Sequence, residues 1–130
     1  NPPNQTRGWP ATRAEIGALV EETGATWIAT TGYAMTGSLA LRFPEVPVWS
    51  VADLKRYGFR GAFPAELCTA PGLLIERLSG PDEISATASE FFETAGIARP
   101  ASRDQFGVML MHYTLTPVSQ PMSLQLCPSR

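Results

Sequence analysis

The chain has 130 residues, of which 44% are apolar and 17% are charged, and its formal net charge is −2. This length and apolar content predict one domain, over residues 1–130, with its own hydrophobic core. The slightly acidic balance argues against nucleic-acid binding, and no Lys/Arg cluster indicates binding to an anionic membrane. No apolar stretch reaches the roughly 18 residues that a membrane-spanning helix needs.

The N-terminal half of the chain predicts a helix followed by a strand–helix–strand unit. Residues 1–11 are rich in Pro, Asn and Gly and predict an entry loop anchored by Trp9. Thr12 and Glu15 are spaced as a capping box, so a helix is expected to start near Thr12 and to end at Gly24, a left-handed C-cap. A strand over 26–30, a helix over 33–42 and a strand over 46–51 follow, and the two strands are expected to be parallel.

The C-terminal half predicts fewer regular elements. We expect an irregular segment over 52–71, a strand over 72–78, a helix over 83–94, a polar loop over 97–105, a strand over 106–116 and a loose tail over 117–130. The predicted fold is a three-layer α/β/α domain with a mainly parallel sheet of about four strands. The last strand is expected either to be parallel like the others or to lie antiparallel at an edge of that sheet.

No motif in the chain assembles a catalytic centre. The dinucleotide fingerprint, the phosphate-binding loop and the serine elbow of hydrolases are all missing from the sequence. His112 is the single histidine, and no Cys, Asp or Ser lies at a spacing from it that is typical of a catalytic motif. This favours a structural role for His112. Cys68 and Cys127 lack the spacing of a zinc site, and pairing or two separate thiols both remain open. We therefore expect no catalytic residue, no metal and no cofactor.

Two segments are candidates for ligand binding. Thr30, Thr31, Gly32 and Tyr33 follow a strand and open a helix, a position where an anion can be held; the alternative, which we favour, is that Thr31 caps the helix. The second candidate interleaves basic and aromatic side chains that suit a phosphate or a sugar, and its favoured alternative is a solvated loop. Its members are Lys55, Arg56, Tyr57 and Arg60.

The sequence resembles a segment near the C-terminus of bacterial polyprenyl-phosphate-sugar glycosyltransferases. This family includes relatives of the lipid A aminoarabinose transferases and of the dolichyl-phosphate-mannose protein mannosyltransferases. The resemblance covers roughly residues 7–78. It is carried by Arg7-Gly8-Trp9, by 24–33, by Gly37, Leu39 and Phe43-Pro44, by Pro47-Val48, by Arg56-Tyr57 and by 71–73.

The resemblance implies a soluble domain on the periplasmic side of the inner membrane. The transmembrane part of the same polypeptide would be its partner, a lipid-linked sugar or an acceptor its ligand, and nucleic acid is not expected. The family's catalytic acidic residues lie in loops between membrane helices, so none is carried over to this chain. Two alternatives stay open: a stand-alone periplasmic module that binds a small anion or sugar, and an interaction domain with an apolar patch around Trp49 and 52–71.

Overall fold

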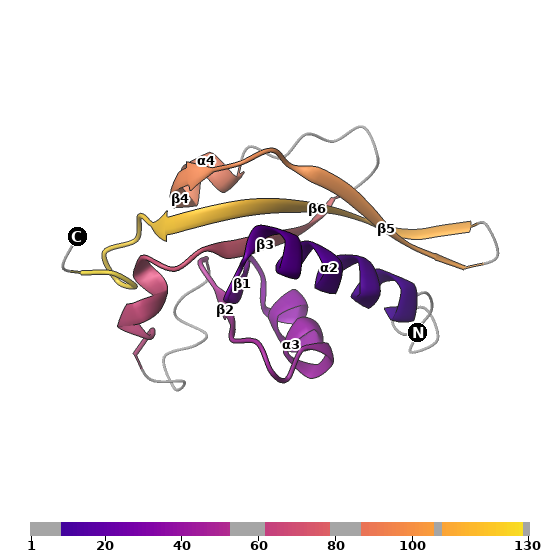
Figure 1. Cartoon of the computed structure of the whole chain (residues 1–130), viewed down its shortest axis with the longest axis horizontal. Helices are drawn as coiled ribbons and strands as arrows, with labels where there is room; N and C mark the ends of the chain where they lie inside the picture. Colours follow the sequence, from indigo (N-terminus) through magenta and orange to yellow (C-terminus); the bar gives the residue numbers. More distant parts are fainter. Residues whose placement is uncertain (1–8, 53–61, 79–86, 106–107, 129–130) are drawn as a thin grey trace.

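A computed structural model describes residues 9–52, 62–78, 87–105 and 108–128. Its regular elements, in chain order, are α2 (Trp9–Thr23), β1 (Trp27–Thr30), α3 (Tyr33–Arg42), β2 (Val48–Ser50), the short 3-10 helix η2 (Ala65–Cys68), β3 (Gly72–Leu78), α4 (Thr87–Phe91), β4 (Phe92–Ala95), β5 (Arg99–Gln105) and β6 (Val108–Pro121). The chain therefore forms a mixed α/β fold, as expected (Figure 1).

The strands form a six-stranded mixed sheet in the order β2-β1-β3-β6, with β4 and β5 both paired to the far edge of β6. β1 is parallel to β2 and to β3, whereas β6 is antiparallel to β3, β4 and β5. The expectation of about four mainly parallel strands is therefore wrong. The last strand is antiparallel but lies inside the sheet, because its 14 residues are long enough to pair with β3 on one edge and with two short strands on the other.

The predictions for 83–105 and for the tail are wrong in part. The predicted helix over 83–94 gives way to β4 at Phe92, and the predicted loop over 97–105 contains β5. β6 continues through Pro117 to Pro121, where a loose tail was expected. Pro117 has no N–H to donate, but its carbonyl accepts the Gly96 N–H at 2.7 Å, so pairing continues past the proline.

The first helix starts earlier than its sequence indicates. α2 begins at Trp9, so the expected capping box is wrong: Thr12 lies inside the helix and is buried. Pro10 is compatible with this start, because a proline in the first helical turn gives up an N–H that has no intrahelical partner. The expected end is confirmed: Gly24 has a φ of +71°, and the N–H groups of Gly24 and Ala25 donate to the carbonyls of Glu21 and Val20 in a Schellman arrangement.

Both faces of the sheet are covered, but by different kinds of structure. α2 and α3 pack on one face, where Ile16 and Leu39 meet Ile28 and Ile75 (Figure 1). On the other face, Trp27 packs against Phe63 and Phe92, with ring centroids 5.3 and 6.1 Å apart. That second layer contains η2 and the segment after β6, and the helix described there, α4, has five residues. The expected α/β/α layering therefore holds on one face of the part described.

None of the helices in the described ranges has the length and apolar content to cross a membrane.

Candidate functional site

The carboxyl end of β1 is held together by hydroxyl groups. Thr30 is fully buried, and its hydroxyl is hydrogen-bonded to that of Thr36 in α3. The Thr36 hydroxyl donates in turn to the Gly32 carbonyl at 2.7 Å. Thr30 therefore attaches α3 to β1, and its hydroxyl is directed into the protein rather than toward a ligand.

The first turn of α3 has no side-chain cap. Gly32 is the N-cap residue, with extended backbone and no capping hydrogen bond from a side chain, so the favoured reading of Thr31 as the cap is wrong. Thr31 and Gly32 are both half-buried beside Thr30 at this strand end. Tyr33 begins α3, and its side chain lies outside the described residues. Anion binding by this segment stays a prediction.

The second predicted site lies outside the described residues. Lys55, Arg56, Tyr57 and Arg60 all fall within 53–61. The chain enters this segment from the carboxyl end of β2, where the Val51 N–H donates to the Thr30 carbonyl at 2.8 Å. Ligand binding by these four residues stays a prediction.

A strip of polar side chains runs along β6 and includes one residue of the adjacent β3, and the sequence predictions did not include it. Glu76 in β3 is only 6% exposed and stands opposite Thr114 of β6, with Thr116 two residues further along the same face. A buried carboxylate is costly unless it is hydrogen-bonded or paired, so a Glu within an apolar strand is the signal that could have revealed the strip. His112 pairs with Leu78 and is half-buried, two residues from Thr114 on the same face.

This strip is the nearest that the described residues come to a catalytic group. Glu76 and His112 form a diagonal pair across two strands, a spacing of about 7–8 Å between backbone positions. Elsewhere in the described ranges, no group of three or more His, Cys, Asp or Glu side chains could hold a metal ion. The strip therefore places polar side chains inside the fold, next to the half-buried His112.

The two cysteines are joined. Cys68 at the end of η2 and Cys127 in the segment after β6 form a disulfide with a Cα–Cα distance of 6.0 Å. Cys127 is buried and Cys68 half-buried. The pairing that the sequence left open is therefore settled. Disulfides form and persist in oxidising compartments and are rare in the cytosol of most organisms.

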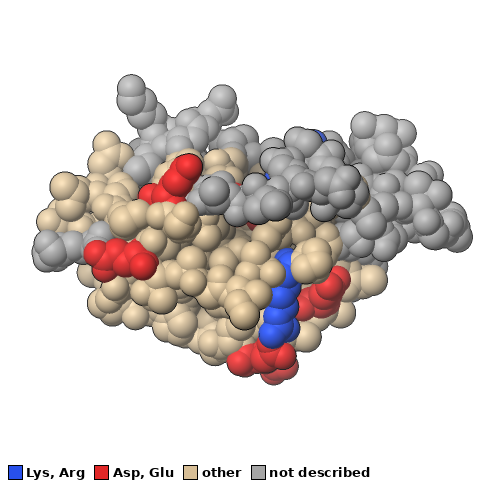
Figure 2. Space-filling view, turned by 90° about the horizontal axis from the view of Figure 1, so that it is seen from above, with Lys and Arg blue, Asp and Glu red and all other residues tan. Residues whose placement is uncertain are grey.

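The described charges do not gather into a basic patch. Arg13 bonds the Arg42 carbonyl at 2.9 Å and Glu45 at 3.1 Å, and Arg99 bonds Glu22 at 2.6 Å. On the face drawn in Figure 2, the clearly visible basic side chain lies against acidic side chains, and the rest of the described surface is largely uncharged. Arg13 and Arg99 thus tie α2 to its neighbours, whereas Arg42 donates to the Ser38 carbonyl within α3.

The expected apolar patch around Trp49 is partly covered. Trp49 is half-buried and packs edge-on against Phe63, with ring centroids 5.4 Å apart. Among the residues whose burial the structure describes, the exposed large apolar side chains are Leu41 on α3, Ile97 between β4 and β5, and Met122 and Leu124 after β6. Single exposed apolar residues are ordinary on protein surfaces.

Comparisons of the chain with models of protein families, with curated proteins and with solved structures find no match.

Proposed function

We propose that this chain is a non-catalytic soluble domain of a membrane glycosyltransferase that transfers a sugar from a polyprenyl-phosphate carrier. The domain would lie on the periplasmic side of the bacterial inner membrane and cover the active site or help the acceptor to enter it. The partner would be the transmembrane part of the same polypeptide.

The Cys68–Cys127 disulfide is the observation that carries this proposal. The resemblance of residues 7–78 implies a domain on the periplasmic side, and the periplasm is a compartment in which a disulfide persists. A cytosolic module would be expected to keep the two thiols reduced. The bond therefore favours the compartment that the resemblance implies.

The arrangement of polar groups supports a non-catalytic role. Thr30 and Thr36 use their hydroxyls to attach α3, and Ser50 uses its hydroxyl in a local bond to Ala52. A nucleophile would need a base within hydrogen-bonding distance. Because the family's catalytic acids lie between membrane helices, the sugar transfer would take place on the membrane part of the enzyme.

The proposal is tested by two measurements. The complete reading frame that encodes this chain is expected to contain several apolar segments of about 20 residues upstream of it. The oxidised chain, mixed with an undecaprenyl-phosphate sugar and an acceptor lipid, is expected to transfer no sugar. Turnover by the chain alone would refute the non-catalytic role, and a reading frame without such segments would refute the membrane enzyme.

A further inference from the structure

The segment that follows β6, residues 122–128, forms a turn of its own. The N–H groups of Leu126 and Cys127 donate to the Ser123 carbonyl at 3.2 and 2.9 Å, and the Gln125 N–H donates to the Ser123 hydroxyl at 3.2 Å. These hydrogen bonds lie within the segment and do not attach it to the sheet. The attachment of this C-terminal segment therefore depends on its first residue and on its side chains.

The C-terminal segment contacts the rest of the described chain through one backbone bond and two buried side chains. The Met122 N–H donates to the Phe91 carbonyl at 2.8 Å. Leu126 and Cys127 are 9% and 2% exposed and belong to the core on the sheet face opposite α2 and α3. Cys127 is bonded to Cys68, whose sulfur lies 3.8 Å from the Leu126 carbonyl oxygen. The disulfide is the covalent member of this set of contacts.

The noncovalent members of the set are weaker than the cost of ordering the C-terminal segment. Fixing the backbone of each residue costs conformational entropy, and five residues lie between Met122 and Pro128. The burial of one leucine and one cysteine side chain offsets only part of that cost. We therefore expect the segment to leave the sheet face when the disulfide is broken, whereas β6 stays paired with β3 and β4.

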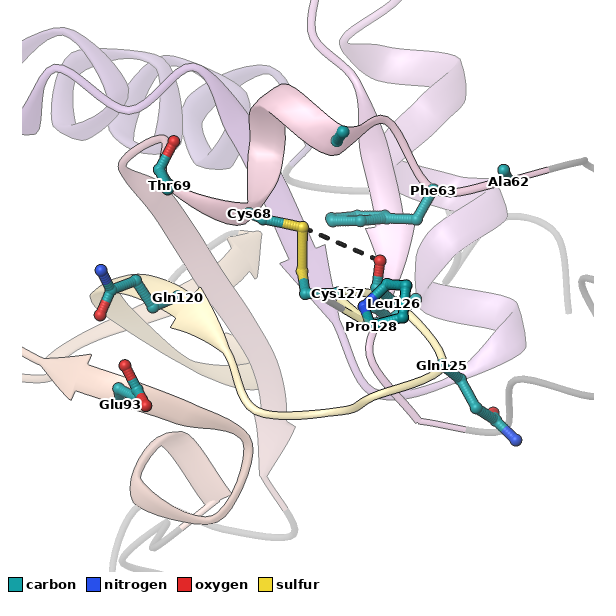
Figure 3. A pocket seen from close by; sticks show the side chains of 11 residues that line it. Ala62, Phe63, Cys68, Thr69, Glu93, Gln120, Gln125, Leu126, Cys127 and Pro128 are labelled. Carbon is teal, nitrogen blue, oxygen red and sulfur yellow. Dashed lines mark hydrogen bonds between the residues drawn. A yellow bond between two sulfur atoms is a disulfide. The ribbon is translucent and has the colours of Figure 1, made fainter. Parts of the chain in front are cut away.

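Cys68 carries the sulfur that a reagent from solution can reach. It is half-buried at the end of η2, whereas Cys127 is buried. Both cysteines line a pocket of about 720 Å³, and Thr69 and Gln120 line it with them (Figure 3). The attacking species in thiol–disulfide exchange is a thiolate, and access decides which sulfur it attacks. The pocket has room for such a group beside Cys68.

We infer that the Cys68–Cys127 disulfide is a reducible latch, which holds the C-terminal segment on the sheet face and releases it when a dithiol reduces the bond. A thiolate of the dithiol attacks the Cys68 sulfur, the S–S bond breaks, and Cys127 leaves as a thiolate that takes up a proton. The second thiol of the dithiol then attacks the sulfur of the first. Cys68 leaves and becomes a thiol, and the dithiol leaves as its own disulfide. Two electrons and two protons thus pass to the cysteines.

Release of the C-terminal segment uncovers apolar surface. Phe63 is 8% exposed, lines the pocket together with Leu126 and packs against Trp27. The latch goes beyond the proposed function and does not depend on it. It can serve a domain of a membrane enzyme or a module that stands alone, so its failure leaves the test by reading frame untouched.

The first test reduces the folded chain with dithiothreitol, without denaturant, and follows amide hydrogen exchange by NMR. Reduction is expected to speed the exchange of the Leu126 and Cys127 amides at least about tenfold, to near that of an unstructured peptide. The amides of Leu73 and Ile75 in β3 are expected to stay at least about a hundredfold slower than an unstructured peptide. A dye that binds apolar surface should fluoresce more strongly with the reduced chain.

The second test identifies the sulfur that is attacked. The oxidised chain is exposed briefly to glutathione, quenched with iodoacetamide and mapped by mass spectrometry. Glutathione is expected on Cys68 and the alkyl group on Cys127, because Cys127 is the leaving thiolate. A dominant product with glutathione on Cys127 would contradict the inference.

A variant on the other sheet face separates attack on the folded chain from attack after global unfolding. Leu39→Ala removes a fully buried side chain of α3 and lowers the stability of the whole domain. Reduction of the folded chain should keep its rate within about twofold in this variant, whereas reduction through unfolding should speed up at least about tenfold. Urea below the unfolding transition makes the same distinction in the parent chain.

The inference fails on any of three results. The first is that the Leu126 and Cys127 amides exchange equally slowly in the oxidised and reduced chains. The second is that β3 loses its protection together with the C-terminal segment. The third is that the rate of reduction follows global stability in Leu39→Ala and in urea.

Discussion

Trp27 and Gly72 show how one missing side chain makes room for the largest residue of the core. The two residues are register partners on β1 and β3, and Trp27 is fully buried. A Cβ atom at position 72 would lie 2.7 Å from the indole Nε1 and 2.9 Å from Cε2. The indole N–H donates to the Ala70 carbonyl at 3.3 Å, which fixes the ring against this strand. The glycine is therefore required by close approach rather than by its own backbone angles.

Gly72→Ala is expected to destabilise the domain by about 1–3 kcal/mol, the usual cost of overpacking a core. Urea unfolding followed by tryptophan fluorescence measures it, as a lower midpoint with an unchanged slope. Gly37→Ala is the matched control. Gly37 lies in the interior of α3, where an added Cβ meets nothing within 4 Å. The free energy of unfolding of this control should rise by up to about 1 kcal/mol, because alanine has a higher helix propensity than glycine. Equal stability of the parent and Gly72→Ala would contradict the argument.

At the scale of elements, the attachment of α3 to β1 depends on a hydroxyl chain. The Thr30 hydroxyl bonds to that of Thr36, which donates to the Gly32 carbonyl. Thr30 and Thr36 are both buried, at 0% and 4% exposure, so water is not available to replace a lost partner. The chain thus joins the end of the strand to the first turn of the helix.

Thr36→Val keeps the shape of the side chain and removes its hydroxyl. It is expected to cost about 1–3 kcal/mol, because the Thr30 hydroxyl is left buried without its bond. Thr36→Ser keeps the hydroxyl and should therefore lose less stability than Thr36→Val, although it removes a methyl group. Thermal unfolding by circular dichroism compares the two variants. If Thr36→Ser proves no more stable than Thr36→Val, the hydroxyl chain does not stabilise this junction.

The helices and strands differ in how well the residues within them and next to them predict them. β1, α3, β2 and β3 were predicted closely, since apolar runs, turns and the proline before β2 mark them within a few residues. β4 and β5 were missed because their sequences, FETA and RPASRDQ, contain few large apolar residues. What makes them strands is pairing with β6, which follows β5 directly in the chain and lies further along the chain from β4. The conformational preferences of a strand's own residues do not identify the strand with which it pairs.

At the scale of the whole molecule, the disulfide joins the connection between β2 and β3 to the C-terminal segment. The two cysteines are 59 residues apart in sequence. Closing a loop of that length restricts the unfolded chain, and the chain-entropy estimate is about 4 kcal/mol. The bond also draws Leu126 and Cys127 onto the face that buries Trp27. We therefore expect the C-terminal segment and the sheet face that it covers to unfold together.

Reduction of the disulfide is expected to lower the free energy of unfolding by about 2–4 kcal/mol. Urea unfolding with and without a thiol reductant measures the change. The double variant Cys68→Ala with Cys127→Ala is the control: it should have the lower stability and should not respond to reductant. A parent chain that is equally stable in both conditions would show that the bond adds nothing to the fold.

The sequence by itself determined the mixed α/β class, the parallel β1–β2 unit and the Gly24 helix end. These follow from composition and from signals that span a few neighbouring residues. The tertiary structure decided that β6 lies inside a mixed sheet, that Cys68 meets Cys127, and that Glu76 is buried opposite Thr114. It also decided that Gln120 and Glu93 share a pocket. Each of these brings together segments far apart in the chain, so strand pairing and packing fix them and no local pattern records them.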